Sequence, residues 1–208
     1  MEKDILVPVL FAAGVLTVIG IIFRLGAAVG RKAQANVRAL ADCVGLQVIE
    51  RPTRFGLLAH PEATGTIRQK AVRLYNYTTG SGKSRTTWSA LAVTPRAHGG
   101  PTFALTAEGI ASRFMEFFGA KEVKVDDPAF DAHWFVRSNA PEYFGAALLP
   151  EICARLGRPR GTWKLQDGVV TYLERGLFSD AARCERFAAA VPAACDLADI
   201  AEVYAQQT

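Results

Sequence analysis

The chain has 208 residues, of which 50% are apolar and 10% are aromatic, and its formal net charge is +4. This apolar content excludes an intrinsically disordered protein. The length fits one domain, or one domain with an appendage. Four cysteines are present without a CxxC pair, and in a cytoplasmic domain we expect all of them to be reduced.

The first predicted element is a membrane helix. The run Ile5–Phe23 is 19 residues long and carries no charge. A helix of this length spans about 30 Å, the thickness of bilayer hydrocarbon, and this one lacks the polar stripe of a soluble helix. We therefore predict an N-terminal transmembrane anchor in residues 1–30. Its predicted lipid-facing side chains are Ile5, Leu6, Val9, Leu10, Phe11, Val15, Leu16, Val18, Ile19, Ile21, Ile22 and Phe23.

Basic residues after this run predict its orientation. Arg24, Arg31, Lys32 and Arg38 follow the helix, whereas one lysine precedes it. Because positive flanks stay on the cytoplasmic side, we predict a single-pass protein of the plasma (inner) membrane with a cytoplasmic C-terminal domain. These four cations are the predicted contacts to the inner leaflet. The alternatives are a cleaved signal peptide, which normally has a positive start and a shorter apolar run, and an exported envelope protein.

Residues 31–45 are predicted to form a juxtamembrane amphipathic helix, which continues from the anchor or follows a break at Gly26–Gly30. Ala33 and Val37 recur at helical spacing, and Gly45 is a natural C-cap. Gly26 and Gly30 form a GxxxG match, which favours helix pairing and makes a homo-oligomer one alternative.

Residues 46–208 are predicted to form one soluble domain. Strands are predicted over residues 46–50, 64–69, 71–77, 86–94, 101–106, 130–137, 161–165 and 169–174. Helices are predicted over residues 110–118, 141–148, 150–156 and from 179 or 180 to about 205, with an interruption at Pro192. Asp167-Gly168 indicates a two-residue hairpin turn. Because helices and strands do not alternate as βαβ units, the predicted class is α+β with mainly antiparallel strands and packed helices.

The net charge conceals a gradient along the chain. Residues 24–100 hold 12 Lys and Arg against 3 acids, whereas residues 101–208 hold 11 against 15. A basic half beside the anchor favours contact with the anionic inner leaflet. Simple solvation of these charges is the alternative. We expect no nucleic-acid partner, because no nucleic-acid motif accompanies the basic half.

The densest polar cluster consists of Asp126, Asp127, Asp131 and His133. Carboxylates beside a histidine suit a divalent metal or acid–base catalysis, although Asp127-Pro128 is also an ordinary turn opener. A metal-dependent or acid–base enzyme is therefore one hypothesis. The hypothesis we prefer is a non-enzymatic, membrane-anchored domain that binds a protein partner or the inner leaflet and needs no cofactor.

Two further motifs include residue types found in nucleotide-binding and nucleophilic sites. Gly82-Lys83-Ser84 resembles the end of a phosphate-binding loop, but Tyr77 stands where the first glycine is required and a strand is predicted to follow. We therefore reject nucleotide binding there. Cys153 and His133 are a nucleophilic pair only if the fold brings them together.

The later half also shows a family-like pattern. Its segments are Phe103–Leu105, Phe117–Gly119, Asp126–Asp131, Phe135–Asn139 and Leu148-Leu149. The pattern resembles a loose family of bacterial single-pass, membrane-anchored proteins, and the match covers about residues 64–175. The resemblance implies a membrane-attached domain without assigned chemistry and supplies no catalytic residues.

Overall fold

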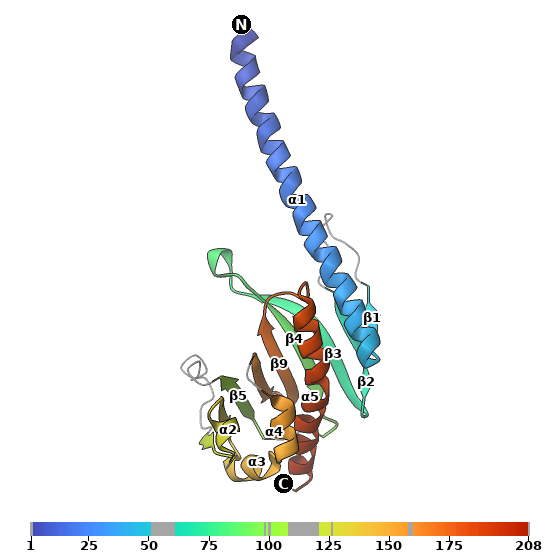
Figure 1. Cartoon of the computed structure of the whole chain (residues 1–208), viewed down its shortest axis with the longest axis vertical. Helices are drawn as coiled ribbons and strands as arrows, with labels where there is room; N and C mark the ends of the chain where they lie inside the picture. Colours follow the sequence, from blue (N-terminus) through green and yellow to red (C-terminus); the bar gives the residue numbers. More distant parts are fainter. Residues whose placement is uncertain are drawn as a thin grey trace.

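The computed structural model describes residues 2–50, 61–97, 99, 101–107, 121–125, 127–157 and 160–207. Within the first helix, the side chains of residues 2–10 and 12 lie outside this description. That helix, α1 (Glu2–Val44), is a continuous rod of 43 residues and is about 65 Å long at 1.5 Å per residue. It does not break at Gly26–Gly30, and its N-terminal part stands clear of the domain (Figure 1).

The C-terminal part of α1 belongs to the hydrophobic core of the domain. Val37, Leu40 and Ala41 are buried and lie in the central apolar cluster. The Asn36 side-chain amide donates to the Phe178 carbonyl at 2.8 Å, which ties α1 to the segment before the last helix. One helix is therefore apolar and exposed at one end and part of the core at the other.

Gly45 ends α1, as the sequence predicts. Its φ is +76°, a left-handed conformation that glycine adopts without steric cost. The Leu46 N–H then donates to the Ala41 carbonyl at 2.8 Å, which closes a Schellman-type cap. The chain can thus reverse tightly into the first strand.

Over the described residues, a nine-stranded sheet forms the body, with strand order β1-β2-β3-β4-β9-β8-β5-β7-β6, and every neighbouring pair is antiparallel. The strands are β1 (Gln47–Ile49), β2 (Glu62–Ile67), β3 (Lys70–Thr79), β4 (Thr86–Thr94), β5 (Phe103–Ala107), β6 (Lys121–Val123), β7 (Trp134–Ser138), β8 (Thr162–Gln166) and β9 (Val169–Arg175). A single turn of 3-10 helix, η1 (Gly82–Ser84), lies at the tip of the β3–β4 hairpin.

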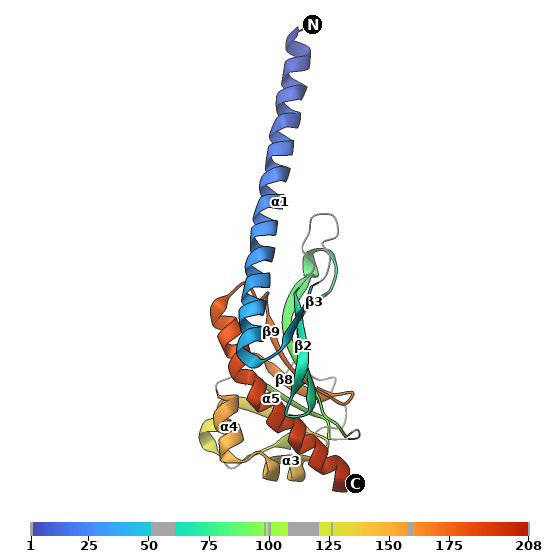
Figure 2. The ribbon, with the colours of Figure 1, turned by 90° about the vertical axis from the view of Figure 1, so that its right-hand side faces the viewer.

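Helices cover one face of this sheet. The long helix α5 (Ala181–Gln207) crosses β4 and β9, and it also contacts α1, α3 (Pro141–Ala147) and α4 (Pro150–Leu156). Figure 2 shows α1, α4 and α5 together on one side of β2 and β3. The core lies between this helical layer and the sheet, which confirms the predicted α+β class with antiparallel strands and packed helices.

Two hairpin turns use left-handed residues. Asp167 and Gly168 join β8 to β9 with φ values of 54° and 72°, which confirms the predicted two-residue turn. The β2–β3 turn was not predicted as such a hairpin. It is made of Arg68 and Gln69, with φ values of 51° and 62°. Neither residue is glycine, so this backbone is unfavourable unless surrounding contacts hold it.

Two predicted elements differ from the structure, and one short strand was not predicted. The strand predicted over 130–137 begins at Trp134, because Asp127 caps the short helix α2 (Pro128–Asp131) that occupies its start. The last helix is not interrupted, because Pro192 sits on its exposed side, where water can satisfy the freed backbone carbonyl. Strand β6 is short and charged, and no periodicity indicated it. The helix predicted over 110–118 lies outside the described residues.

Candidate functional site

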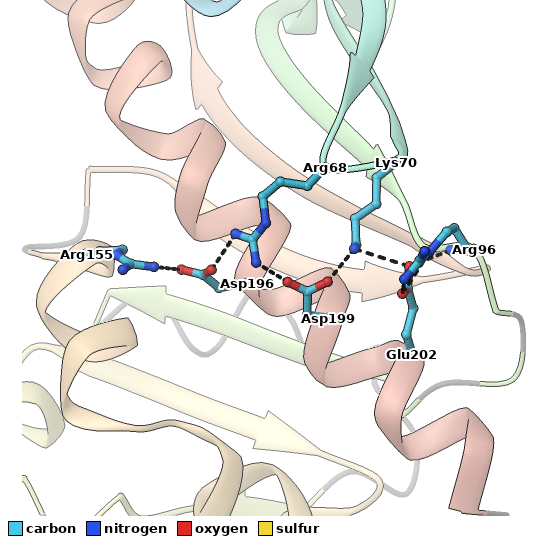
Figure 3. A network of polar contacts seen from close by, with 7 residues as sticks. All are labelled: Arg68, Lys70, Arg96, Arg155, Asp196, Asp199 and Glu202. Carbon is cyan, nitrogen blue, oxygen red and sulfur yellow. Dashed lines mark hydrogen bonds and ion pairs between the residues drawn. The ribbon is translucent and has the colours of Figure 1, made fainter.

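Acidic residues line one face of α5. Asp196, Asp199 and Glu202 are spaced by three, so they lie on the same side of the helix. Asp196 and Glu202 are buried, and Asp199 is 37% exposed at its side chain. Four cations converge on this row from other elements (Figure 3): Arg68, Lys70, Arg96 and Arg155.

The cations form a chain of shared contacts along the row. Arg68 in the β2–β3 turn donates to Asp196 at 2.7 Å and also pairs with Asp199. Lys70 pairs with Asp199 as well, and Arg155 of α4 pairs with the second oxygen of Asp196. Arg68 thus ties the strained turn to α5, and Gln69 accepts from Arg96 Nη1 at 2.6 Å. These contacts hold the two non-glycine residues in the left-handed conformation.

Glu202 closes the row at its C-terminal end. It accepts from the backbone N–H of Arg96 at 2.7 Å and from Arg96 Nη2 at 2.8 Å, and it lies 3.4 Å from the Lys70 ammonium. Burial alone opposes the charged form, but these contacts outweigh it and lower the pKa of Glu202 to about 2. The Lys70 side chain is 1% exposed, and it lies between the carboxylates of Asp199 and Glu202.

A second buried carboxylate lies where β9 packs on α5. Glu174 accepts from the Tyr172 hydroxyl at 2.7 Å and from Nε and Nη2 of Arg186 at 2.9 and 2.7 Å. Burial raises the pKa of Glu174, but the hydrogen bonds from Arg186 and Tyr172 overcome it, so the pKa is lowered. Burial raises the pKa of Tyr172, and the bond to Glu174 raises it further. Because these groups are hydrogen-bonded to one another, we assign them a structural role in joining β9 to α5.

These ion pairs neutralise part of the positive charge that the sequence places in residues 24–100. Among the described residues, no acid occurs between Glu62 and the end of β5, but Arg68, Lys70 and Arg96 are paired with acids of α5. Arg73 is paired with Glu62 at 2.5 Å. Much of the basic half is therefore neutralised inside the domain. The spacing of three between acids on α5 is the sequence signal that points to this arrangement.

Two cations of the same acid-free stretch have no such partner. Lys83 and Arg85 are exposed at the tip of the β3–β4 hairpin, and neither forms an ion pair within the described part of the chain. The tip lies at the end of the domain that faces the N-terminal part of α1 (Figures 1 and 2).

The predicted anchor side chains that the structure describes are exposed. Relative exposure runs from 42% at Val15 to 74% at Phe11, and the group comprises Phe11, Val15, Leu16, Val18, Ile19, Ile21, Ile22 and Phe23. The side chains of Ile5, Leu6, Val9 and Leu10 lie outside the description. Over the described residues, α1 is the one helix with the length and apolar character to cross a bilayer, so it is a candidate membrane anchor.

The predicted leaflet contacts divide into two groups. Arg24, Arg31 and Lys32 are exposed on α1. Arg38 is also exposed, but it pairs with Glu50 just beyond β1. Three of the four cations therefore have no ion-pair partner among the residues the structure describes, and the fourth is engaged within the chain.

The predicted polar cluster does not gather in the described residues. Asp127 caps α2 by accepting from the N–H groups of Ala129 and Phe130 at 3.0 and 3.1 Å. Asp131 accepts from the Val125 N–H at 3.3 Å, and His133 is exposed. Asp126 lies outside the description. No group of three metal-ligating side chains occurs among the residues the structure describes, so the metal or acid–base hypothesis stays a prediction.

Cys153 is a poor nucleophile in this environment. It is buried, and its Sγ lies 3.5 Å from the Leu148 carbonyl. Burial, reinforced by the charges of Asp127 and Asp131, raises the pKa of the Cys153 thiol to about 11. The thiol is therefore protonated at neutral pH, which argues against a nucleophilic role for Cys153.

A shallow hollow lies on the sheet face opposite α5. Its volume is about 530 Å³, and its walls are mainly threonine, alanine and valine side chains of β2, β3 and β4. Arg73 and Tyr75 also line it, and the Arg73 guanidinium lies 4.5 Å from the centre of the Tyr75 ring. Because Arg73 is already paired with Glu62, this hollow offers no unpaired charge to a ligand.

Comparison with known proteins identifies one similar solved structure. No family model and no curated protein matches the chain. The similar structure is the crystal structure of the mycobacterial trehalose monomycolate transport factor A, TtfA. The two chains are 9% identical, with a TM-score of 0.49, and the match covers 83% of this chain and 93% of TtfA. A likeness at this level carries no functional argument.

Proposed function

We propose that this chain is a single-pass plasma-membrane protein whose cytoplasmic domain is a non-enzymatic binding module held rigidly against the inner leaflet. The observation that carries this proposal is the continuity of α1, which is exposed and apolar at one end and buried in the core at the other. A flexible linker would let the domain tumble, whereas a continuous helix gives it one orientation.

The geometry of α1 brings the domain close to the lipid. If the hydrocarbon ends at Phe23, the first core residue, Ala33, lies about 15 Å further along the helix at 1.5 Å per residue. Surface electrostatics reach about 8 Å at physiological salt, which is less than this separation. The β3–β4 hairpin tip extends from the domain toward the N-terminal part of α1 and so shortens the remaining distance (Figures 1 and 2). This geometry supports a contact between the hairpin tip and lipid head groups.

Charge complementarity favours lipid over a protein partner at this end. Lys83 and Arg85 are unpaired within the described residues, as are Arg24, Arg31 and Lys32 on α1. Each Lys or Arg near an anionic leaflet gains about 1 kcal/mol. The two hairpin cations thus contribute about 2 kcal/mol toward holding the tip on the membrane. Because the helix already restricts the orientation of the domain, a free energy of this size favours orientations in which the tip contacts the membrane.

Hydrogen–deuterium exchange tests the proposal on the full chain in nanodiscs. We expect residues 79–86 to exchange more slowly in nanodiscs with anionic lipid than in zwitterionic ones. The double variant Lys83→Gln, Arg85→Gln removes that difference. A matched double variant, Lys121→Gln, Lys164→Gln, removes two cations elsewhere on the sheet and keeps it. Equal exchange of the tip in both lipids would refute the leaflet contact.

A further inference from the structure

A small cavity rich in arginine lies between α4, the sheet and α5. Its volume is about 140 Å³. The side chains that give it chemical character are Trp134, Arg155, Arg160, Trp163, Tyr172 and Arg186. No carboxylate is among its described lining residues. The helix α4, which contributes to the cavity, lies in the part of the domain remote from the N-terminal end of α1 in both views (Figures 1 and 2).

The three arginines keep donors free toward a ligand. Arg160 is exposed and makes no ion pair with the described residues. Arg155 engages Asp196 through Nη1, and Arg186 engages Glu174 through Nε and Nη2. A guanidinium carries five N–H donors in a planar fork, so both keep donors beyond these pairs.

The carboxylates behind the cavity do not balance its positive charge. Asp196 is shared between Arg155 and Arg68. Glu174 is shared between Arg186 and Arg183, whose Nε lies 3.4 Å from it. Each acid thus serves two arginines, and Arg160 adds a further cation. An anion entering the cavity meets a net positive environment.

The aromatic walls are held in place before any ligand arrives. The Trp134 indole N–H donates to the Gly157 carbonyl at 2.7 Å. The Trp163 and Tyr172 rings lie 4.5 Å apart, and the Tyr172 hydroxyl is bonded to Glu174. Such bonds fix the ring positions, and preorganisation of this kind reduces the entropic cost of binding.

We propose that this cavity binds an oxyanion, a phosphate or a carboxylate, carried by a water-soluble ligand. Planar guanidinium groups bind both anions through paired N–H···O bonds. The volume is below the 300–1,000 Å³ typical of sites that enclose a whole drug-sized ligand. The cavity therefore takes the anionic head group, and an adjoining apolar or planar part of the ligand lies against the aromatic walls.

Intrinsic fluorescence tests this site, because two of the three tryptophans of the chain line it. The third, Trp88, lies in β4 and is replaced in a Trp88→Phe background. The full chain is reconstituted in zwitterionic nanodiscs and titrated with inorganic phosphate and, separately, with citrate. We expect a saturable change in emission with one of these anions.

Arginine variants distinguish the cavity from general surface charge. Arg160→Gln is expected to weaken anion binding about tenfold, the loss of one charge-assisted contact, and Arg160→Lys to weaken it less. Arg160 is exposed, so neither change should affect folding. Arg175→Gln, an exposed arginine of β9 that does not line the cavity, should bind as the parent does. Absence of saturation with both anions, or equal affinity in Arg160→Gln and its parent, would overturn the proposal.

Discussion

Removing the charge of Glu202 tests how the network on α5 supports the fold. The ordinary pKa of a glutamate is 4.5, and that of Glu202 is about 2. A difference of this size corresponds to about 3 kcal/mol. Arg96 is 55% exposed at its side chain, so solvent screening reduces the figure, and we expect Glu202→Gln to lower the free energy of unfolding by about 2 kcal/mol.

The assay is chemical or thermal denaturation of the full chain in detergent, followed by tryptophan fluorescence. A loss of 2 kcal/mol lowers the midpoint temperature by about 4–8 °C for a domain of this size. Glu185→Gln is the matched control, because Glu185 is exposed on the same helix, and it should change stability by less than about 0.5 kcal/mol. If Glu202→Gln behaves like that control, the network adds no net stability and the reasoning fails.

A double variant sharpens this test. Asp199→Asn together with Glu202→Gln leaves the buried Lys70 ammonium without either of its recorded carboxylates. We expect the combined loss to exceed the sum of the two single losses by about 1 kcal/mol, because the groups share one partner. Simple additivity would show that Lys70 does not link the two acids energetically.

Three further predictions concern the packing of α1, the pH dependence of stability and the buried Glu174. Leu40→Ala should destabilise the domain by about 2–4 kcal/mol in denaturant titrations, whereas Leu25→Ala, at a residue that is 63% exposed, should leave the domain unchanged. Because the pKa of Glu202 is lower in the folded state, its contribution to the free energy of unfolding is present above about pH 4.5 and is lost as the pH falls toward 2. The stability of Glu202→Gln should therefore depend less on pH in this range than the stability of the parent. Tyr172→Phe removes one donor from buried Glu174, so it should cost about 1 kcal/mol in the same titrations and raise the carboxyl pKa measured by NMR.

Local signals predicted most of the fold. Alternation over 86–94 gave a strand with the bounds that β4 has, and Gly45 marked the end of α1 because only glycine adopts its φ without cost. Elements defined by weak or competing patterns were harder to predict. Asp127 caps a short helix where the start of the strand over 130–137 was predicted. Strand β6 has three residues, too few to show a periodic pattern.

The candidate sites depended on contacts between distant segments. The arginine cavity joins residues of α4, β7, β8, β9 and α5, and no spacing along the chain brings Arg160 next to Arg186. Lys70 and Glu202 also pair although most of the domain's sequence lies between them. Summed charge over a half-chain indicated a basic surface, but it does not reveal which cations meet an acid in space. The sequence shows the spacing of the three acids on α5, but it does not show which cations pair with them.

The central claim is that α1 holds the domain on the cytoplasmic side of a membrane, and Cys43 provides its most direct test. Cys43, near the end of α1, is the one exposed cysteine; Cys153 and Cys195 are buried, and Cys184 is half-buried. Membrane vesicles of known sidedness are treated with a membrane-impermeant maleimide, with Cys43→Ser as the control. We predict labelling at Cys43 in inside-out vesicles and none in right-side-out vesicles. Labelling in intact right-side-out vesicles, or recovery of the chain in the aqueous fraction without detergent, would contradict the proposed topology.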